Sequence, residues 1–461
     1  MEAADPTHPA DNLAREIELA VEQITDDDSP APSPGDGHRG SFSKVVARLT
    51  GVNAVILVAG LVTGPITARA LGVEGRGDLA AITAILTVGP WLLDLGLSVW
   101  LGRERARGVS REELLGAALP VAFACSLIGV AAAIPLSHAL GNGRPVVTTF
   151  LQIGLFLMPI SVVLQTLAGL AIGESRWGLI IANRIAGSIV PAITIVVLAV
   201  LGHLTVATAA GAYLIGALLG ALLFLRAVGG MRGLVFDRRR TAAATRFGIR
   251  SWLSTVALTA NSRLDLVLMA ALVSSRQLGL YAIAVTVASV THGLIGAVSS
   301  ALFPRVAEGD REIAARCSRI TMAVVAIVGT GLVVVSPWLI PFVFGEAFAD
   351  AVPMFIILQI ASVPMVGAFV LSSALSAANN PAATMRAELV ALAFAVPALI
   401  LLLPAHGGLL AAVVSLIAYI IRLAVQLRPA RQAFSSSYRS FLLPTPADLV
   451  WLKDLVRRTL R

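Results

Sequence analysis

Long apolar runs alternate with short polar linkers over most of this chain. Twelve runs have about the length of roughly 20 residues that an α-helix needs to span a bilayer. Their centres lie near Leu57, Leu92, Leu127, Met158, Val190, Ile215, Ala260, Val290, Thr330, Val363, Phe394 and Val414. Membrane-spanning strands would instead appear as short segments of alternating polarity. The pattern therefore predicts an all-α polytopic membrane protein with about twelve transmembrane helices.

The composition also favours a bilayer over water as the main solvent. Hydrophobic residues make up 57% of the 461 residues and charged residues only 13%, whereas about 25% of residues are charged in soluble domains. A single soluble core stops growing near ~250–300 residues, so this apolar content is more than a soluble fold of one domain would use.

Arginines cluster in alternate linkers. The linkers after the second, sixth and eighth runs hold Arg103, Arg105, Arg107 and Arg111, then Arg226, Arg232, Arg238, Arg239, Arg240, Arg246 and Arg250, then Arg305, Arg311, Arg316 and Arg319. The odd-numbered linkers hold only Arg69, Arg76, Arg144 and Arg276. Because cytoplasmic loops carry an excess of Lys and Arg, both chain ends are predicted to be cytoplasmic, in a protein of the cytoplasmic membrane.

A long basic linker at residues 229–250 divides the runs into two sets of six. It predicts an N-terminal lobe at residues 41–228 and a C-terminal lobe at residues 251–430, around a central cavity. Shifting the sequence by 202 residues places Gly77 on Gly279 and Arg103 on Arg305. Such internal similarity is typical of transporters built from two related halves.

The two chain ends differ from the spans. The first 40 residues hold ten of the 27 acidic residues, and residues 1–40 are predicted to be a disordered cytoplasmic tail. The alternative is a docking helix at residues 11–24. One face of that helix would carry Leu13, Ile17, Val21 and Ile24. Residues 444–461 predict an amphipathic helix on the cytoplasmic leaflet, where its arginines meet anionic membrane lipids. The net charge of +8 reflects the basic linkers, and no nucleic-acid-binding module is visible.

Residues Arg69–Ala81 form a polar, glycine-rich break between the first two runs. Glycines permit a positive φ angle, so the chain can reverse within a few residues, and Asp78 favours the N-terminus of the next helix. One interpretation is a tight hairpin connector. In the other, Arg69 and Arg76 are outer-gate contacts for an anionic substrate.

This turn resembles that of polysaccharide flippases of the multidrug/oligosaccharidyl-lipid/polysaccharide (MOP) exporter superfamily, the Wzx-type O-antigen and exopolysaccharide transporters. In that family the turn commonly reads as a small residue, Arg, two small or apolar residues and Gly, then a GRG-like element. Here the matching residues are Ala68, Arg69, Ala70, Leu71 and Gly72, then Gly75, Arg76 and Gly77. The resemblance implies a flippase for oligosaccharide linked to polyprenyl diphosphate. If residues 11–24 form a docking helix, polysaccharide polymerase machinery is the candidate partner.

Ionisable side chains inside apolar runs are candidates for a substrate pathway, because they are costly in a bilayer. Asn261, Arg263 and Asp265 lie near the middle of the seventh run. Asn261 and Asp265 share a helical face, whereas Arg263 points elsewhere. A guanidinium offers a diphosphate a planar, bidentate donor, which makes Arg263 the best-placed pathway residue. A buried structural pair with a carboxylate is its alternative role.

Three further polar residues are pathway candidates with structural alternatives. Asp94 lies close enough to Arg103 to snorkel towards the cytoplasm. His292 lies in the middle of the eighth run, where ring packing is the common role of a lone histidine. Asn53 is able to form an interhelical hydrogen bond or to meet sugar hydroxyls.

Two other function classes remain open. An ion-coupled multidrug exporter shares the fold, although acidic cavity residues would suit it better than an intramembrane arginine. A membrane glycosyltransferase or polymerase of the same pathway needs a sizeable outer loop, and the odd-numbered linkers are short. Phosphate-loop, GxSxG and HExxH patterns do not occur in the sequence. We therefore expect a transporter with no catalytic residues, no cofactor and no metal site.

Overall fold

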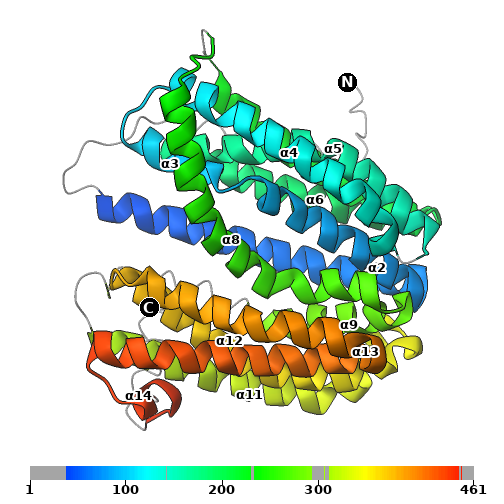
Figure 1. Ribbon diagram of the computed structural model, residues 1–461. Coiled ribbons are helices and arrows are strands. Elements are labelled where there is room, and N and C mark those ends of the chain that lie inside the picture. The colour runs from blue at the N-terminus through cyan, green and yellow to red at the C-terminus, as the bar shows by residue number, and fades with distance from the viewer. Residues whose placement is uncertain are drawn as a thin grey trace, which may run out of the picture.

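The computed structural model describes residues 38–141, 143–229, 233–292, 306, 311–445 and 448 (Figure 1). Every regular element in these ranges is helical. Eight of the helices are long and apolar enough to cross a membrane. The prediction of an all-α polytopic membrane protein is confirmed. The predicted acidic tail and the predicted C-terminal amphipathic helix lie almost entirely outside the described residues.

Two of the eight helices each contain two spans. Helices α2 (His38–Leu93) and α13 (Pro381–Phe434) reverse at Gly72 and Gly407, whose φ angles are 69° and 63°. Residues with a Cβ rarely adopt a positive φ angle. Glycine therefore allows the chain to reverse at a single non-helical residue. Counting both halves, and adding α8 (Arg238–Leu272) and α9 (Ser275–Ala288), gives the twelve segments that the apolar runs predict.

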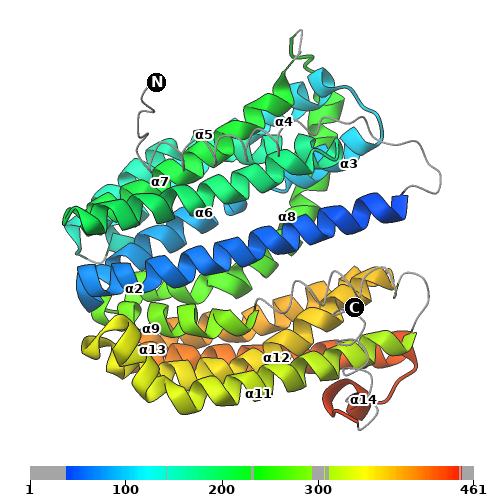
Figure 2. The same cartoon turned by 180° about the vertical axis from the view of Figure 1, so that it is seen from behind.

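The helices form two stacked groups (Figures 1 and 2). The first, here called the N-lobe, contains α2, α3 (Leu97–Ala106), α4 (Arg111–Gly141), α5 (Pro145–Gly173), α6 (Trp177–Val200), α7 (Val206–Leu222) and the 3-10 helix η1 (Leu223–Val228). The C-lobe contains α9, η2 (Ser289–His292), α11 (Arg311–Phe344), η3 (Glu346–Ala351), α12 (Val352–Ala377), α13 and α14 (Tyr438–Leu442).

Helix α8 lies against both lobes. It begins at Arg238, within the predicted basic linker, and runs without a break to Leu272. Its first part packs on α4 and α3 of the N-lobe and its last part on α13 of the C-lobe. In Figure 1, α8 descends from α3 past α2 towards α9. The segment that joins the lobes is therefore itself a long helix.

The two ends of the molecule differ in their apolar cores. At the end that contains the turns at Gly72 and Gly407, here called the hairpin end, one cluster joins both lobes; it includes Leu79 and Ile82 of α2, and Tyr281 and Phe355 of the C-lobe. At the opposite end, which carries the arginine-rich linkers and is here called the basic end, each lobe has its own cluster. The lobes are thus bound together by apolar packing at the hairpin end.

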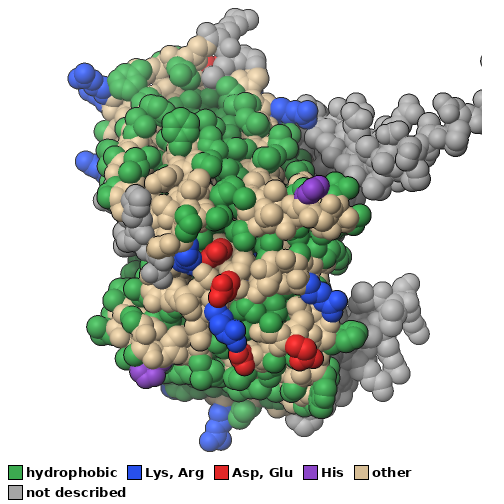
Figure 3. Space-filling view, turned by 90° about the vertical axis from the view of Figure 1, so that its right-hand side faces the viewer, with side chains coloured by type: hydrophobic (Ala, Val, Ile, Leu, Met, Phe, Trp, Pro, Cys, Tyr) green, Lys and Arg blue, Asp and Glu red, His purple; other side chains and the backbone are tan. Residues whose placement is uncertain are grey.

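Charged side chains also gather at the hairpin end. Figure 3 looks onto this end and shows Lys, Arg, Asp and Glu side chains across the middle of the face, with hydrophobic side chains above and below them. Described ionisable residues of this end include Arg69, Asp78, Arg144, Arg276 and Asp350. This band lies where the two lobes meet.

Candidate functional site between the lobes

Arg263 and Asp265 lie two residues apart on α8 and have different environments. Arg263 is exposed and makes no hydrogen bond or ion pair with a described residue, although its positive charge acts on the nearby Asp265 carboxylate. Asp265 accepts a hydrogen bond of 2.6 Å from the Tyr281 hydroxyl of α9 and one of 2.8 Å from the Leu266 backbone N–H. The arginine is thus available to a ligand, and the carboxylate belongs to the C-lobe. The Asn261 side chain lies outside the described residues.

A small pocket surrounds Asp265 inside the C-lobe. Ser415 and Tyr419 of α13 line it together with aliphatic side chains. The Tyr281 hydroxyl also lies 3.4 Å from the Ser415 hydroxyl, so one carboxylate meets a short chain of hydroxyl groups. A carboxylate in contact with hydroxyl groups can bind and release a proton. In the described part of the chain, no cluster of three His, Cys, Asp or Glu residues could hold a metal ion.

Asp94 lies at a break between α2 and α3. The chain passes through Leu95 (φ 48°) and Gly96 (φ 68°) before α3 begins. Asp94 is 3% exposed; its carboxylate accepts hydrogen bonds from the Ser98 backbone and hydroxyl, at 3.2 and 2.7 Å, and from the Thr166 hydroxyl, at 2.7 Å. These contacts cap α3 and tie it to α5. The break gives Asp94 a structural position that its spacing from Arg103 does not reveal.

The other two candidates lie apart from Arg263 in the sequence and in their contacts. Asn53 of α2 accepts a hydrogen bond of 2.9 Å from Arg184 of α6, and both residues are exposed. This is the interhelical hydrogen bond that the sequence offers as one alternative for Asn53. His292 ends η2, and its side chain lies outside the described residues.

The arginines of the predicted outer turn have different environments. Arg69 donates hydrogen bonds to the carbonyls of Phe342 and Val343 near the end of α11, the second at 3.0 Å. It thereby satisfies carbonyls that the end of a helix leaves without partners. Arg76 has a buried Nε atom with no hydrogen-bond partner in the described structure. Arg69 therefore links the two lobes through backbone carbonyls of α11.

The glycines of the turn allow close packing. A Cβ on Gly75 would lie 3.2 Å from a methyl group of Val206. A Cβ on Gly77 would overlap the backbone carbonyl of Ser275, and a Cβ on Gly279 would overlap that of Val73. Gly77 and Gly279, which the 202-residue shift pairs, thus bring the backbones of the two lobes into direct contact.

The structure contains two polar contacts whose residues were not among the candidates from the sequence. Arg422 and Glu388, both of α13, form an ion pair of 2.6 Å with only 6% and 3% of their side chains exposed. Arg144 reaches from the N-lobe to backbone and side-chain atoms at the hairpin end. An arginine inside the last apolar run was a visible signal for the first. Nothing in the sequence pairs Arg144 with its partners.

At the basic end, each lobe has a carboxylate held by two arginines. Glu174 accepts hydrogen bonds from Arg105, at 2.7 Å, and from Arg111. Partial burial acts to raise the pKa of the Glu174 carboxyl, but the two guanidinium groups outweigh it and the pKa lies below its ordinary value. These residues are here called the Glu174 cluster.

The C-lobe counterpart is the Asp448 cluster. Arg319 of α11 donates to both carboxylate oxygens of Asp448, at 2.5 and 2.6 Å, and Arg316 lies 3.8 Å away. The backbone and hydroxyl of Thr445 add two bonds of 2.7 Å. Hydrogen bonds from Arg319 and then Thr445 hold the pKa of this carboxyl well below its usual range.

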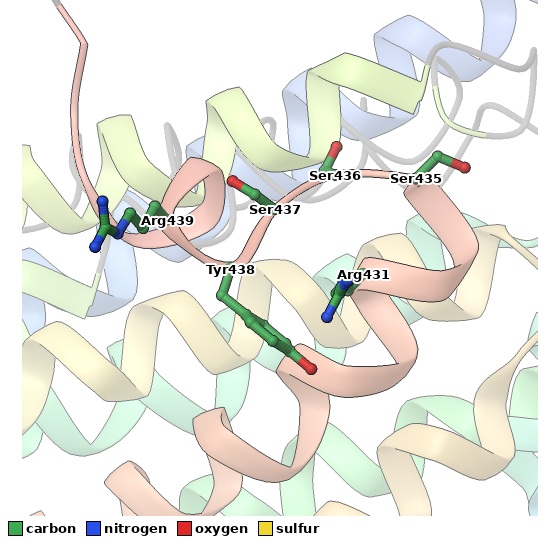
Figure 4. A pocket seen from close by; sticks show the side chains of 6 residues that line it. All are labelled: Arg431, Ser435, Ser436, Ser437, Tyr438 and Arg439. Atoms are coloured by element: carbon green, nitrogen blue, oxygen red, sulfur yellow. The ribbon is translucent and has the colours of Figure 1, made fainter.

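A second, shallower pocket lies near the same end of the C-lobe, between the end of α13 and α14 (Figure 4). Arg431 lies over the ring of Tyr438, 5.0 Å from its centre, whereas Arg439 points away from this pair in Figure 4. The two guanidinium groups do not converge on one point of this pocket.

Solved structures with a related fold, all at low identity, include the following three. A lipid II flippase MurJ in an inward closed conformation is 14% identical and covers 84% of this chain and 89% of its own, with a TM-score of 0.71. An inward-facing multidrug resistance MATE family transporter of the MOP superfamily is 15% identical, covers 84% and 98%, and has a TM-score of 0.62. A MOP superfamily transporter from Pyrococcus furiosus is 14% identical, covers 90% and 98%, and has a TM-score of 0.54.

These similarities establish the fold and agree with the MOP resemblance of the glycine-rich turn. A comparison with curated protein sequences gives no match. A family defined by sequence does match: residues 43–309, more than half of the chain, match the family described as polysaccharide biosynthesis protein. This protein therefore belongs to the polysaccharide biosynthesis protein family.

Proposed function

We propose that this protein is a flippase that moves oligosaccharide linked to polyprenyl diphosphate across the cytoplasmic membrane by alternating access. The distribution of apolar cores carries this proposal: the lobes share one core at the hairpin end and have separate cores at the basic end. An alternating-access transporter closes one end of its pathway while the other is open. Family membership supports the saccharide cargo.

The environment of Arg263 favours an anionic cargo. The lipid tail of such a substrate stays in the hydrocarbon, but its sugars and diphosphate need a polar route. Arg263 makes no hydrogen bond or ion pair with a described residue, and the Asp265 carboxylate, on which its charge also acts, accepts a hydrogen bond from Tyr281. A planar guanidinium can bind a phosphate through two parallel hydrogen bonds. An exporter of cationic drugs would need an available carboxylate there instead.

Transport of a fluorescent polyprenyl-diphosphate-linked oligosaccharide in proteoliposomes tests this role. Arg263→Ala should lower the transport rate by roughly tenfold or more, since hydrogen bonds to a charged group are lost. Arg263→Lys should retain part of the rate, because it keeps the charge but not the bidentate geometry. Arg246→Ala is the matched control, an exposed arginine on the same helix near the basic end.

Stability measurements separate the two roles of Arg263. Its side chain is exposed in the described structure, so Arg263→Ala should reach the membrane in normal amounts and unfold at the wild-type temperature. A variant that is poorly made would favour a structural pair. A stable Arg263→Ala protein with the wild-type transport rate would refute the proposed binding role.

The basic end faces the cytoplasm in this proposal. Gly233 and Gly143 lie in linkers at the basic and hairpin ends respectively. With both native cysteines replaced by serine, a cysteine at Gly143 should react with a membrane-impermeant thiol reagent in intact cells, and one at Gly233 should be protected. The reverse pattern would contradict the orientation, although not the cargo.

The proposal also excludes group transfer. Purified protein should convert neither a nucleotide sugar nor a lipid-linked oligosaccharide into a new covalent product. Product formation, detected by mass spectrometry, would place the protein in the enzyme class. Anionic lipids at the basic linkers and polymerase machinery at residues 11–24 are the partners that belong to this proposal.

A further inference from the structure

Arg144 is the centre of a hydrogen-bond cluster that crosses between the lobes. It belongs to the N-lobe, in the linker between α4 and α5, and its guanidinium binds the backbone carbonyl of Ala270 near the end of α8. The same guanidinium lies 3.4 Å from the Asp78 carboxylate and 3.4 Å from the Ser275 hydroxyl. One side chain thus contacts groups that the fold brings from three other segments.

Asp78 completes the connection. Its carboxylate accepts a hydrogen bond of 2.7 Å from the Ser275 hydroxyl, which lies at the start of α9 in the C-lobe. The Arg144 and Asp78 side chains are only 13% and 21% exposed. Charge-assisted hydrogen bonds shielded from water are stronger than those on an open surface. We call Arg144, Asp78, Ser275 and Ala270 the Arg144 cluster.

The cluster lies beside a close backbone contact between the lobes. Gly77 precedes Asp78, and a Cβ on Gly77 would overlap the Ser275 carbonyl. The groups of the Arg144 cluster therefore meet only while these backbones touch. Separation of the lobes at this end would break the bonds to Ser275 and Ala270, and it would leave the guanidinium to find other partners.

We propose that Arg144, Asp78 and Ser275 are positioning residues that hold the transport pathway closed at the hairpin end, so that their rupture is part of each transport cycle. This inference rests on the proposed alternating access, but its main test does not require transport. Arg144 also donates to the Gly141 carbonyl, at 2.9 Å, and so helps to end α4. A purely local role in the N-lobe is the alternative that the test must separate.

A distance measurement between the lobes provides this test. His203 is an exposed residue between α6 and α7 of the N-lobe, and His406 is an exposed residue of the C-lobe directly before the reversal at Gly407. Spin labels on cysteines at these positions, with Cys125 and Cys317 replaced by serine, report the separation at the hairpin end in nanodiscs. The parent protein should give one main distance, that of the closed end.

Removal of the guanidinium should open this end. In Arg144→Gln, the fraction of molecules with a longer distance should rise by roughly tenfold, as expected for the loss of charge-assisted hydrogen bonds. Ser275→Ala should have a smaller effect in the same direction, and Arg144→Lys should restore most of the closed distance. Asp350→Asn, an exposed carboxylate in η3, is the control and should leave the distance unchanged.

Two results would overturn the inference. Arg144→Gln with the parent distance would show that the cluster does not hold the lobes together. A lower unfolding temperature with an unchanged distance would assign Arg144 to the end of α4 alone. Since both readouts are taken without substrate, neither depends on the cargo.

A cross-link then connects the cluster to transport. A disulfide between cysteines at Asp78 and Ser275 should hold the hairpin end closed and abolish transport, and a reductant should restore the rate. Continued transport by the cross-linked protein would contradict alternating access at this interface. The inference about Arg144 would still stand if Arg144→Gln lengthened the distance, so the two failures can be told apart.

Discussion

Arginine side chains at the hairpin end bind groups outside their own lobe, whereas those at the basic end bind carboxylates within one lobe. At the hairpin end, Arg69 and Arg144 of the N-lobe donate to backbone carbonyls beyond that lobe, and glycine backbones meet directly. At the basic end, the Glu174 cluster stays within the N-lobe and the Asp448 cluster within the C-lobe. Contacts between lobes must break in a transport cycle, whereas contacts within a lobe can persist through it.

The two clusters of the basic end also differ from each other. Glu174 follows α5 directly, inside the N-lobe. The corresponding linker between α12 and α13, residues 378–380, contains no carboxylate, and the C-lobe arginines instead bind Asp448 from the segment beyond α14. The same electrostatic contact therefore stabilises a linker in one lobe and attaches the C-terminal segment in the other.

The largest effect is expected from a side chain at the lobe contact. Gly77→Leu would drive a side chain into the Ser275 backbone, and overpacking of a close contact costs about 1–3 kcal/mol or more. The distance between labels at His203 and His406 should lengthen in most molecules. Gly211→Leu on α7 is the control, because a Cβ there would meet no atom within 4 Å. An unchanged distance in Gly77→Leu would remove the basis for the comparison of the two ends.

Loss of the Glu174 carboxylate should lower stability without moving the lobes. Glu174→Gln leaves Arg105 and Arg111 partly buried without a counter-charge, which should lower the free energy of unfolding by about 1.5–3 kcal/mol. Thermal unfolding in detergent measures this loss, and the spin-label distance should remain that of the parent. Glu104→Gln, which removes a more exposed ion pair with Arg107, should change stability much less. A lengthened distance in Glu174→Gln would mean that this end also couples the lobes.

The Asp448 cluster should affect the attachment of the segment around α14 and not the stability of the whole protein. Asp448→Asn weakens the bonds to Arg319, so the segment around α14 should separate from α11 more often. Limited digestion with trypsin should then cleave faster after the exposed Arg439, with little change in the unfolding temperature. Glu312→Gln removes an 88% exposed carboxylate near Arg316 and should leave the digestion rate unchanged. An unchanged rate in Asp448→Asn would indicate that apolar contacts alone hold the segment.

Acid should release the same segment. The pKa of the Asp448 carboxyl is lowered in the folded protein, so its stabilising effect is complete above the ordinary value near ~4 and is lost as the pH falls through the lowered value. Resistance to an acid-active protease should therefore be constant between about pH 7 and pH 5 and decline only below about pH 4. In Asp448→Asn, this decline should be much weaker. A loss of resistance near neutral pH would point to a different titrating group.

The sequence predicts much of the fold because a single physical signal determines it. Apolar runs of the length of a bilayer become the helices, and Gly72 reverses the chain within the predicted turn. Contacts between distant segments leave no such signal. Arg69 binds carbonyls 273 and 274 residues away, and the break at Leu95 and Gly96 gives Asp94 the role of a cap. Arginines within spans, such as Arg263 and Arg422, are the exception, since an arginine in a span is costly enough to be conspicuous in the sequence itself.

The smallest effect is expected at an ion pair that lies at the hairpin end but within one lobe. Arg276 of α9 and Asp350 of η3 are 2.9 Å apart, with 56% and 66% of their side chains exposed. Exposed pairs contribute about 0–1 kcal/mol, because water and ions screen them. Arg276→Gln should therefore leave the spin-label distance and the transport rate unchanged, and it should shift the unfolding temperature slightly at most. Arg144→Gln should lengthen this distance. If Arg276→Gln lengthened it equally, the net charge of the hairpin end, rather than the hydrogen bonds between the lobes, would keep this end closed. The contrast between these two arginines thus decides whether the hairpin end is closed by its specific interlobe contacts.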